Sequence, residues 1–193
     1  MTSSNLGDSA FILIRGRKVI YESPSQQHFF NCPYQLTVIP ENYPDQGMYI
    51  RDKPQDAQCS SFTLQDGDLI LLATDGFFDN VYAHEALAIV NHELDNVEVD
   101  PHHHHYSHLS ASPTSADSEP RTNVEETEDM ILRIRNLCRR LTDTARRFSL
   151  DPKRMSPWAV SAREHGGRYQ GGKEDDITCI VTLVRNTNLI GKE

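Results

Sequence analysis

Two acidic turns carry the residues of this chain that are best suited to chemistry. The first turn, 74–80, contains Asp75 and directly follows an apolar run at 69–73. The second turn, 172–178, contains Asp175 and leads into the last apolar run of the chain. A carboxylate at the rim of a hydrophobic sheet is costly unless a cation or a hydrogen-bond donor compensates it. The two turns therefore indicate a metal site.

Carboxylates at such positions match the chemistry of hard divalent cations. Mg²⁺ and Mn²⁺ bind carboxylate and water oxygens, and a pair of them can lower the pKa of a water and direct it at a phosphorus atom. Gly76 permits close backbone approach, and Asp79 and Asp8 could widen the site. However, Asp-Gly is also a common turn, and Asp79 or Asp175 could equally cap a helix or a strand end. The residues alone leave both interpretations open.

Composition narrows the class of protein. The 193 residues and 37% hydrophobic content suffice for one domain with a core, and the net charge of -9 argues against a nucleic-acid binder. No apolar run is long enough for a membrane span, and no targeting segment is visible at the start of the sequence. The four cysteines are far apart, which indicates neither a zinc site nor a disulfide framework and favours an intracellular, reducing compartment.

The elements that would position the acidic turns follow from apolar patterning. Strands are predicted at 10–15, 19–22, 34–39, 69–73 and 177–184, the first two forming a hairpin. Helical spacing predicts a short helix at 84–94, a long helix whose apolar stripe runs from Met130 to Phe148, and a short helix opened by Ser156 and Pro157.

The segment 95–123 differs in character from the rest. It contains four consecutive histidines followed by Ser, Pro, Thr and Asp, so it cannot bury enough apolar surface to order itself. The histidines could bind a metal, but a solvated linker is favoured. We therefore divide the chain into a partial domain at 1–94, a disordered low-complexity insertion at 95–123 and the remainder of the domain at 124–193.

Three motifs in this order resemble a known family. They are Asn-Leu-Gly-Asp-Ser at 5–9, the stretch 66–79 with Asp-Gly-Asp and Ala-Thr-Asp-Gly-Phe-Phe-Asp, and Gly-Lys-Glu-Asp-Asp-Ile-Thr at 172–178. Together they resemble the C-terminal half of a metal-dependent serine/threonine protein phosphatase of the type 2C class. The stretches 26–31, 33–36 and 155–157 resemble the mitochondrial branch of that class, which implies a mitochondrial location.

The resemblance implies an α+β fold, namely part of a four-layer α-β-β-α sandwich of antiparallel sheets with flanking helices. Asp75 and Asp175 would be ligands of paired Mn²⁺ or Mg²⁺ ions, and Asp8 and Asp79 would correspond to the positions that bind a further metal. Gly76 and Asp176 would support these ligands without binding the ions. The implied reaction is attack of a metal-activated water on phosphoserine or phosphothreonine of a phosphoprotein substrate, without a phosphoenzyme.

One family motif has no counterpart in this chain. The Asp-Gly-x-x-Gly turn, whose Asp bridges both metals in the family, is not matched anywhere in the sequence. We therefore expect a truncated domain, a splice form or an incomplete gene model, with weak or no activity by this chain alone. The alternatives are a non-catalytic interaction module or pseudophosphatase of the same descent, and a fragment without a stable fold. The oligomeric state is left open.

Overall fold

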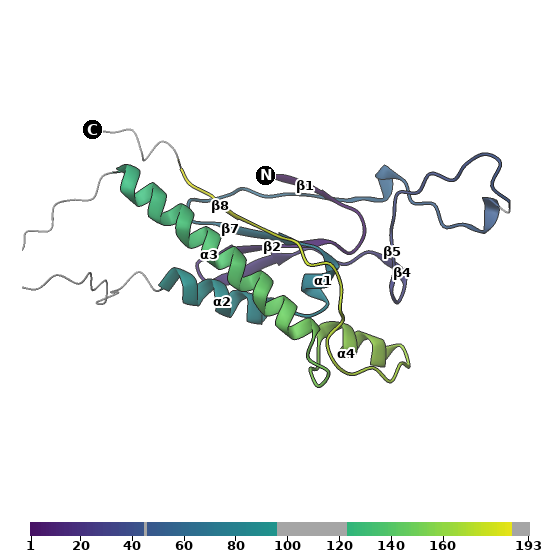
Figure 1. Ribbon diagram of the computed structural model, residues 1–193. Coiled ribbons are helices and arrows are strands. Elements are labelled where there is room, and N and C mark those ends of the chain that lie inside the picture. Colours follow the sequence, from purple (N-terminus) through teal and green to yellow (C-terminus); the bar gives the residue numbers. More distant parts are fainter. Residues whose placement is uncertain (45, 96–122, 187–193) are drawn as a thin grey trace, which may run out of the picture.

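A four-stranded antiparallel sheet forms the centre of the molecule (Figure 1). The structure, a computed structural model, describes residues 1–44, 46–95 and 123–186. The strand order is β3-β2-β7-β8, so β7 lies between the hairpin and the last strand. The strands are β2 (Ala10–Arg15), β3 (Lys18–Glu22), β7 (Leu69–Ala73) and β8 (Cys179–Leu183).

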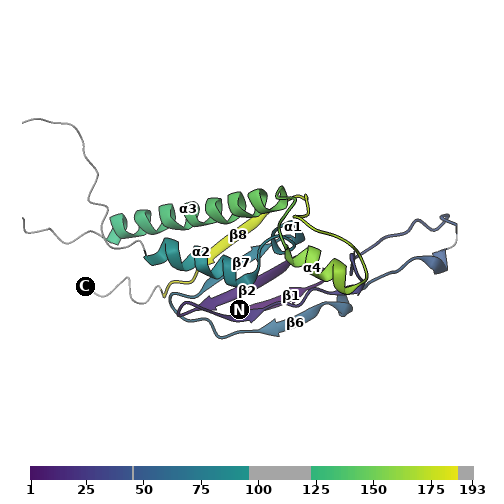
Figure 2. The same ribbon diagram turned by 90° about the horizontal axis from the view of Figure 1, so that it is seen from below.

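Two helices cover one face of this sheet, as Figure 2 shows. They are α2 (Ala83–Asp95) and α3 (Asn123–Ser149), and α3 runs beside both α2 and β8. Alternate strand residues such as Ile12 and Leu71 meet helix residues such as Val90 and Leu141 in a core where each of these four is fully buried. The long apolar stripe predicted from Met130 to Phe148 thus lies on a helix whose inner side packs against the sheet.

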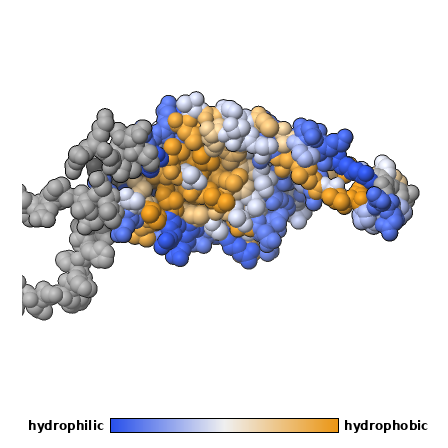
Figure 3. Space-filling model, turned by 90° about the horizontal axis from the view of Figure 1, so that it is seen from above, coloured by the Kyte–Doolittle hydropathy of each residue, from blue (hydrophilic) through white to orange (hydrophobic). Residues whose placement is uncertain are grey.

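The opposite face of the sheet is only partly covered. The two-stranded sheet of β1 (Thr2–Asn5) and β6 (Gln58–Ser61) is separate from the main one, and Phe62, which follows β6, packs its ring against Phe11 and Tyr21. Over β7 and β8, however, Leu72 and Ile180 remain 41% and 54% exposed. A hydrophobic patch is visible on this side of the molecule in Figure 3.

Short elements gather at the end of the sheet where β7 finishes. Helix α1 (Asp75–Phe78) follows β7 directly, and α4 (Pro157–Glu164) lies close by (Figure 1). Ser156 caps α4, because its side chain accepts a hydrogen bond from Ala159 N at 3.1 Å. The remaining elements are β4 (Gln27–Phe29), β5 (Cys32–Pro33) and two short 3₁₀ helices, η1 (Gln46–Met48) and η2 (Pro54–Asp56).

Most of the predicted elements are confirmed, and the α+β fold class is correct. The strand predicted at 34–39 is wrong, since that segment forms only an isolated bridge between Leu36 and Asp52. The first acidic turn is a short helix rather than a plain turn, and β1 was not predicted because its sequence is polar. The insertion predicted at 95–123 lies, apart from its ends, outside the described residues.

Two further findings concern the cysteines and the helices. All four cysteines are free thiols. Within the described ranges, every helix is too short or too polar to cross a bilayer.

Candidate metal centre

Strand pairing brings the two acidic turns to the same edge of the sheet. β7 and β8 are antiparallel, with Leu69 opposite Leu183 and Ala73 opposite Cys179. The end of β7 therefore meets the beginning of β8. Hydrogen bonds continue past the strands, because Thr74 N donates to Thr178 O at 3.1 Å.

Thr74 fastens the first turn to the second through its side chain as well. Its hydroxyl donates to Asp176 O at 3.0 Å and accepts from Thr178 N at 3.1 Å. Asp75 follows as the first residue of α1, and Asp79 N donates to Asp75 O at 2.7 Å. One helical turn thus places Asp75 and Asp79 on the same side of α1, facing the turn that carries Asp175.

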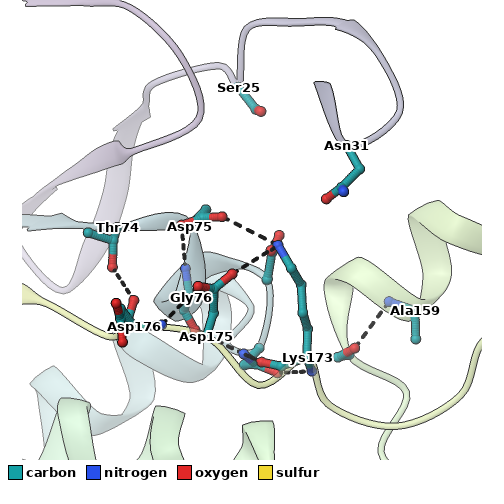
Figure 4. Close-up of polar contacts among 12 residues, drawn as sticks. Ser25, Asn31, Thr74, Asp75, Gly76, Ala159, Lys173, Asp175 and Asp176 are labelled. Carbon is teal, nitrogen blue, oxygen red and sulfur yellow. Dashed lines mark hydrogen bonds and ion pairs between the residues drawn. The ribbon is translucent and has the colours of Figure 1, made fainter. Parts of the chain in front are cut away.

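Three carboxylates converge at this edge. Asp75, Asp79 and Asp175, which we call the carboxylate cluster, each offer an oxygen that lies within 4.8 Å of the other two. An ammonium group lies among them (Figure 4), with Lys173 Nζ 2.6 Å from Asp79 Oδ2. The same nitrogen lies 3.2 Å from Asp175 Oδ2 and 3.4 Å from Asp75 Oδ2.

Burial and charge alter the acidity of these groups. Burial raises the pKa of Asp79 to about 6, although hydrogen bonding to Lys173 opposes the shift. Burial, and after it the charge of Asp75, also raises the pKa of Asp8. For Lys173, burial acts to lower the pKa of the ammonium, but Asp79 and the other two carboxylates of the cluster outweigh it and raise that pKa above its ordinary value. The cluster is therefore a place where negative charge is costly without a cation.

A buried asparagine fixes the backbone of the second turn to the first. Asn80 is fully buried, and its amide nitrogen donates to Gly76 O at 2.9 Å and to Lys173 O at 2.8 Å. Its amide oxygen accepts from Lys173 N at 2.9 Å. We call this three-bond contact the Asn80 clamp. It satisfies both backbone groups of Lys173 and so holds residue 173 at a set position beside α1.

Glycine is required where the two turns touch. A Cβ on Gly76 would lie 2.4 Å from Asp176 O, closer than packed atoms allow, and a tight 3.2 Å from Asp175 Cβ. The second turn passes a similar constriction at Gly172, where a Cβ would lie 2.1 Å from Phe148 O. Both glycines thus allow backbone contacts that bring the carboxylate cluster together.

A cavity of about 250 Å³ opens beside the cluster. Asp75 and Asp79 form part of its wall, and Asp8, Asn31 and Trp158 line it as well. Figure 4 shows Asn31 and Ser25 across an open space from the carboxylates. The arrangement leaves the cluster accessible from one side, as a site acting on a bound molecule requires.

The predicted site residues are largely brought together. Asp75, Asp79 and Asp175 form the cluster, whereas Asp8 lines the same cavity outside that group of three. Gly76 and Asp176 contribute backbone contacts rather than ligand atoms.

Sequence reasoning missed Lys173 and Asn80, although both lie within the two turns. Lys173 was visible as the only basic residue of the second turn, and Asn80 as the last residue of the first. The metal site was predicted from the positions of acidic residues, and these positions carry no information about a neighbouring cation or amide.

The donor set fits a divalent cation. Carboxylate oxygens are the ligands that Mg²⁺ and Mn²⁺ favour, and the Lys173 ammonium already stands in for a cation among them. Asp75, Asp79 and Asp175 are the residues that would hold such an ion.

Comparisons with known proteins find relatives that are named as protein phosphatases. No known family model matches the chain. The protein named "Protein phosphatase PTC7 homolog" from Homo sapiens is 34% identical over 182 residues, which cover 94% of this chain and 48% of that protein. The Drosophila melanogaster protein "Protein phosphatase PTC7 homolog fig" is 36% identical over 187 residues, covering 96% of this chain and 48% of its own length. The chain therefore spans about half the length of the curated relatives it matches.

A solved structure shares the fold. It is described as the X-ray structure of the photosystem II phosphatase PBCP, and it superposes with a TM-score of 0.64 at 25% identity. The match covers 95% of this chain and 58% of that one.

Proposed function

Because this chain is homologous to protein phosphatases of the type 2C class, we propose that it serves the metal-dependent hydrolysis of phosphoserine or phosphothreonine in proteins. The observation that carries the proposal is the convergence of Asp75, Asp79 and Asp175 around one cation position, although they come from two turns far apart in the sequence. A structural turn would not need three carboxylates that share a single counter-ion.

The residues of the chain have distinct tasks in this proposal. Asp75, Asp79 and Asp175 hold Mn²⁺ or Mg²⁺, with Asp8 available to a further ion at the wall of the cavity. The bound ions supply activation of water and neutralisation of phosphate charge. Gly76 and Asp176 hold the two turns in contact, and the cavity beside the cluster receives the phosphorylated side chain.

We further propose that this chain alone is weakly active or inactive. Its sequence contains no counterpart of the family's Asp-Gly-x-x-Gly turn, and it spans about half the length of its relatives. A metal pair that lacks a bridging carboxylate binds less tightly and activates water less well. The resemblance of 26–31, 33–36 and 155–157 to the mitochondrial branch supports a mitochondrial location, which fluorescence microscopy of a tagged protein would test.

The experiment is a phosphopeptide assay on the purified chain. We expect slow phosphate release that needs Mn²⁺ and is abolished by Asp75→Asn. The matched control is Asp143→Asn, which removes the same charge from an exposed position on α3 and leaves the rate unchanged. Release that persists without a divalent ion, or that survives Asp75→Asn, would refute the proposal.

A second candidate is a non-catalytic interaction module, and the uncovered sheet face favours it. Leu72 and Ile180 are exposed apolar residues on adjacent strands, as at surfaces that bind another polypeptide. Partner capture that is unchanged by Asp75→Asn combined with Asp175→Asn, but lost on Leu72→Asp, would favour this candidate over the phosphatase.

A further inference from the structure

We propose that Lys173 sets the affinity of the carboxylate cluster for divalent ions, because its ammonium is the resident counter-ion that an incoming ion must displace. The inference rests on the proposed metal site and identifies a residue that opposes loading of that site.

The ammonium and a divalent ion need the same space. Lys173 Nζ contacts one oxygen from each carboxylate, at 2.6, 3.2 and 3.4 Å. Each of the three carboxylates offers an oxygen within 4.8 Å of oxygens from the other two, so an ion held by all three would occupy the space beside the nitrogen. Two like charges at such a separation repel strongly in a partly buried site. The ammonium therefore has to leave when the ion enters.

Lys173 can leave the cluster without disturbing the site. The Asn80 clamp holds the backbone of residue 173 through both of its polar groups. Only the flexible side chain extends into the cluster, and it is 20% exposed. A lysine side chain has several rotatable bonds and a compact charge, so rotation alone moves the ammonium. Displacement thus leaves the carboxylates in place.

The displaced ammonium group has room beside the cluster. The cavity beside the cluster has a volume of about 250 Å³ and includes Asp79 and Trp158 in its wall. Lys173 Nζ already lies 5.9 Å from the centre of the Trp158 ring, within the range of a cation–π contact. A rotated ammonium can therefore remain near an aromatic face and open solvent.

A purely structural ion pair would behave differently. If Lys173 only supported the turn, its removal would loosen the cluster and weaken ion binding. If Lys173 competes with the ion, its removal leaves three unbalanced carboxylates and strengthens ion binding. The two roles predict opposite changes in affinity.

The test is a calorimetric titration of the full chain with Mn²⁺ alone and with Mg²⁺ alone. Lys173→Met should bind either ion roughly tenfold more tightly than the unaltered chain, since a competing charge is gone. Lys173→Arg keeps the charge and should stay within about twofold of the original affinity. The control Lys18→Met removes an exposed lysine in the β2–β3 hairpin and should change nothing.

A second measurement does not depend on a variant that folds. Acylation of lysine amines, followed by mass spectrometry of the unaltered chain, should show the reactivity of Lys173 rising when Mn²⁺ is added, while that of Lys18 stays constant. Lys173 that remains protected at saturating Mn²⁺ would overturn the inference.

The titration separates the inference from the proposed function. Equal or weaker binding by Lys173→Met, with clear binding by the unaltered chain, overturns the role of Lys173 and leaves the metal site intact. Absence of binding by both proteins overturns the metal site and the inference together.

Discussion

The Asn80 clamp offers the sharpest test of how the two turns are held together. Asn80→Ala removes three hydrogen bonds of 2.8 to 2.9 Å and leaves Gly76 O and both backbone groups of Lys173 without their partner. Each bond contributes about 1 kcal/mol net, and stranded buried groups add to that cost. We therefore expect the free energy of unfolding to fall by about 3 kcal/mol, a large share of the roughly 5–15 kcal/mol typical of a domain.

A second variant separates hydrogen bonding from side-chain volume. Asn80→Asp keeps the shape but replaces the amide nitrogen with an oxygen that faces the carbonyl oxygens of Gly76 and Lys173. It should destabilise the fold by at least as much as Asn80→Ala, because it buries a charge against two carbonyl oxygens and keeps only the Lys173 N–H as a donor. The control Asn91→Ala, on α2, should shift stability by less than about 0.5 kcal/mol.

The assay is urea denaturation in metal-free buffer, with the slope compared between variants to establish that the unfolding transition is the same. A loss of less than about 1 kcal/mol for Asn80→Ala would refute the reasoning, since the clamp would then contribute no more than a single ordinary hydrogen bond.

Three further predictions concern other contacts of the fold. Gly76→Ala forces a Cβ to within 2.4 Å of Asp176 O, so calorimetry should show a clearly lower melting temperature, whereas Gly47→Ala, which meets nothing within 4 Å, should not. A hydrogen bond from Arg15 holds the pKa of buried Asp68 below its ordinary value, so this carboxylate contributes stability above pH about 4 that is lost as the pH falls through its lowered pKa. Asp68→Asn should therefore cost about 2 kcal/mol or more at pH 7 and flatten the fall in urea midpoint below pH 4, and a parallel fall in both proteins would contradict this. Ser156→Ala removes the cap of α4 and a 2.7 Å bond to Gly171 O, which should cost about 1–2 kcal/mol in the same assay.

The sequence predicted the parts of the fold that depend on local patterning. The apolar runs that became β2 and β7, and the stripe that became α3, are visible because burial on one or both faces demands apolar residues at fixed spacing. The same reasoning failed at 34–39, where alternation without a partner strand yields only an isolated bridge. It also missed β1, because its polar side chains carry no burial signal.

The candidate site, like the fold, could be predicted from the sequence only in part. The Asp residues of the two turns were identifiable by type and by their place beside strands, and β7–β8 pairing explains why they meet. The Asn80 clamp and the ammonium of Lys173 depend on tertiary distances between residues 93 and 94 positions apart in the chain. No local pattern reports such distances, so these two residues required the structure.

The position of β8 at the margin of the sheet has a consequence for biosynthesis. Asp75 and Asp79 leave the ribosome early, while the ammonium that neutralises them is encoded up to 98 residues later. A nascent chain therefore carries unmatched negative charge beside a half-built sheet until the turn with Lys173 and strand β8 dock beside β7. A polypeptide stalled before Lys173 would lack both this ammonium and the carboxylate of Asp175, and with them the complete cluster.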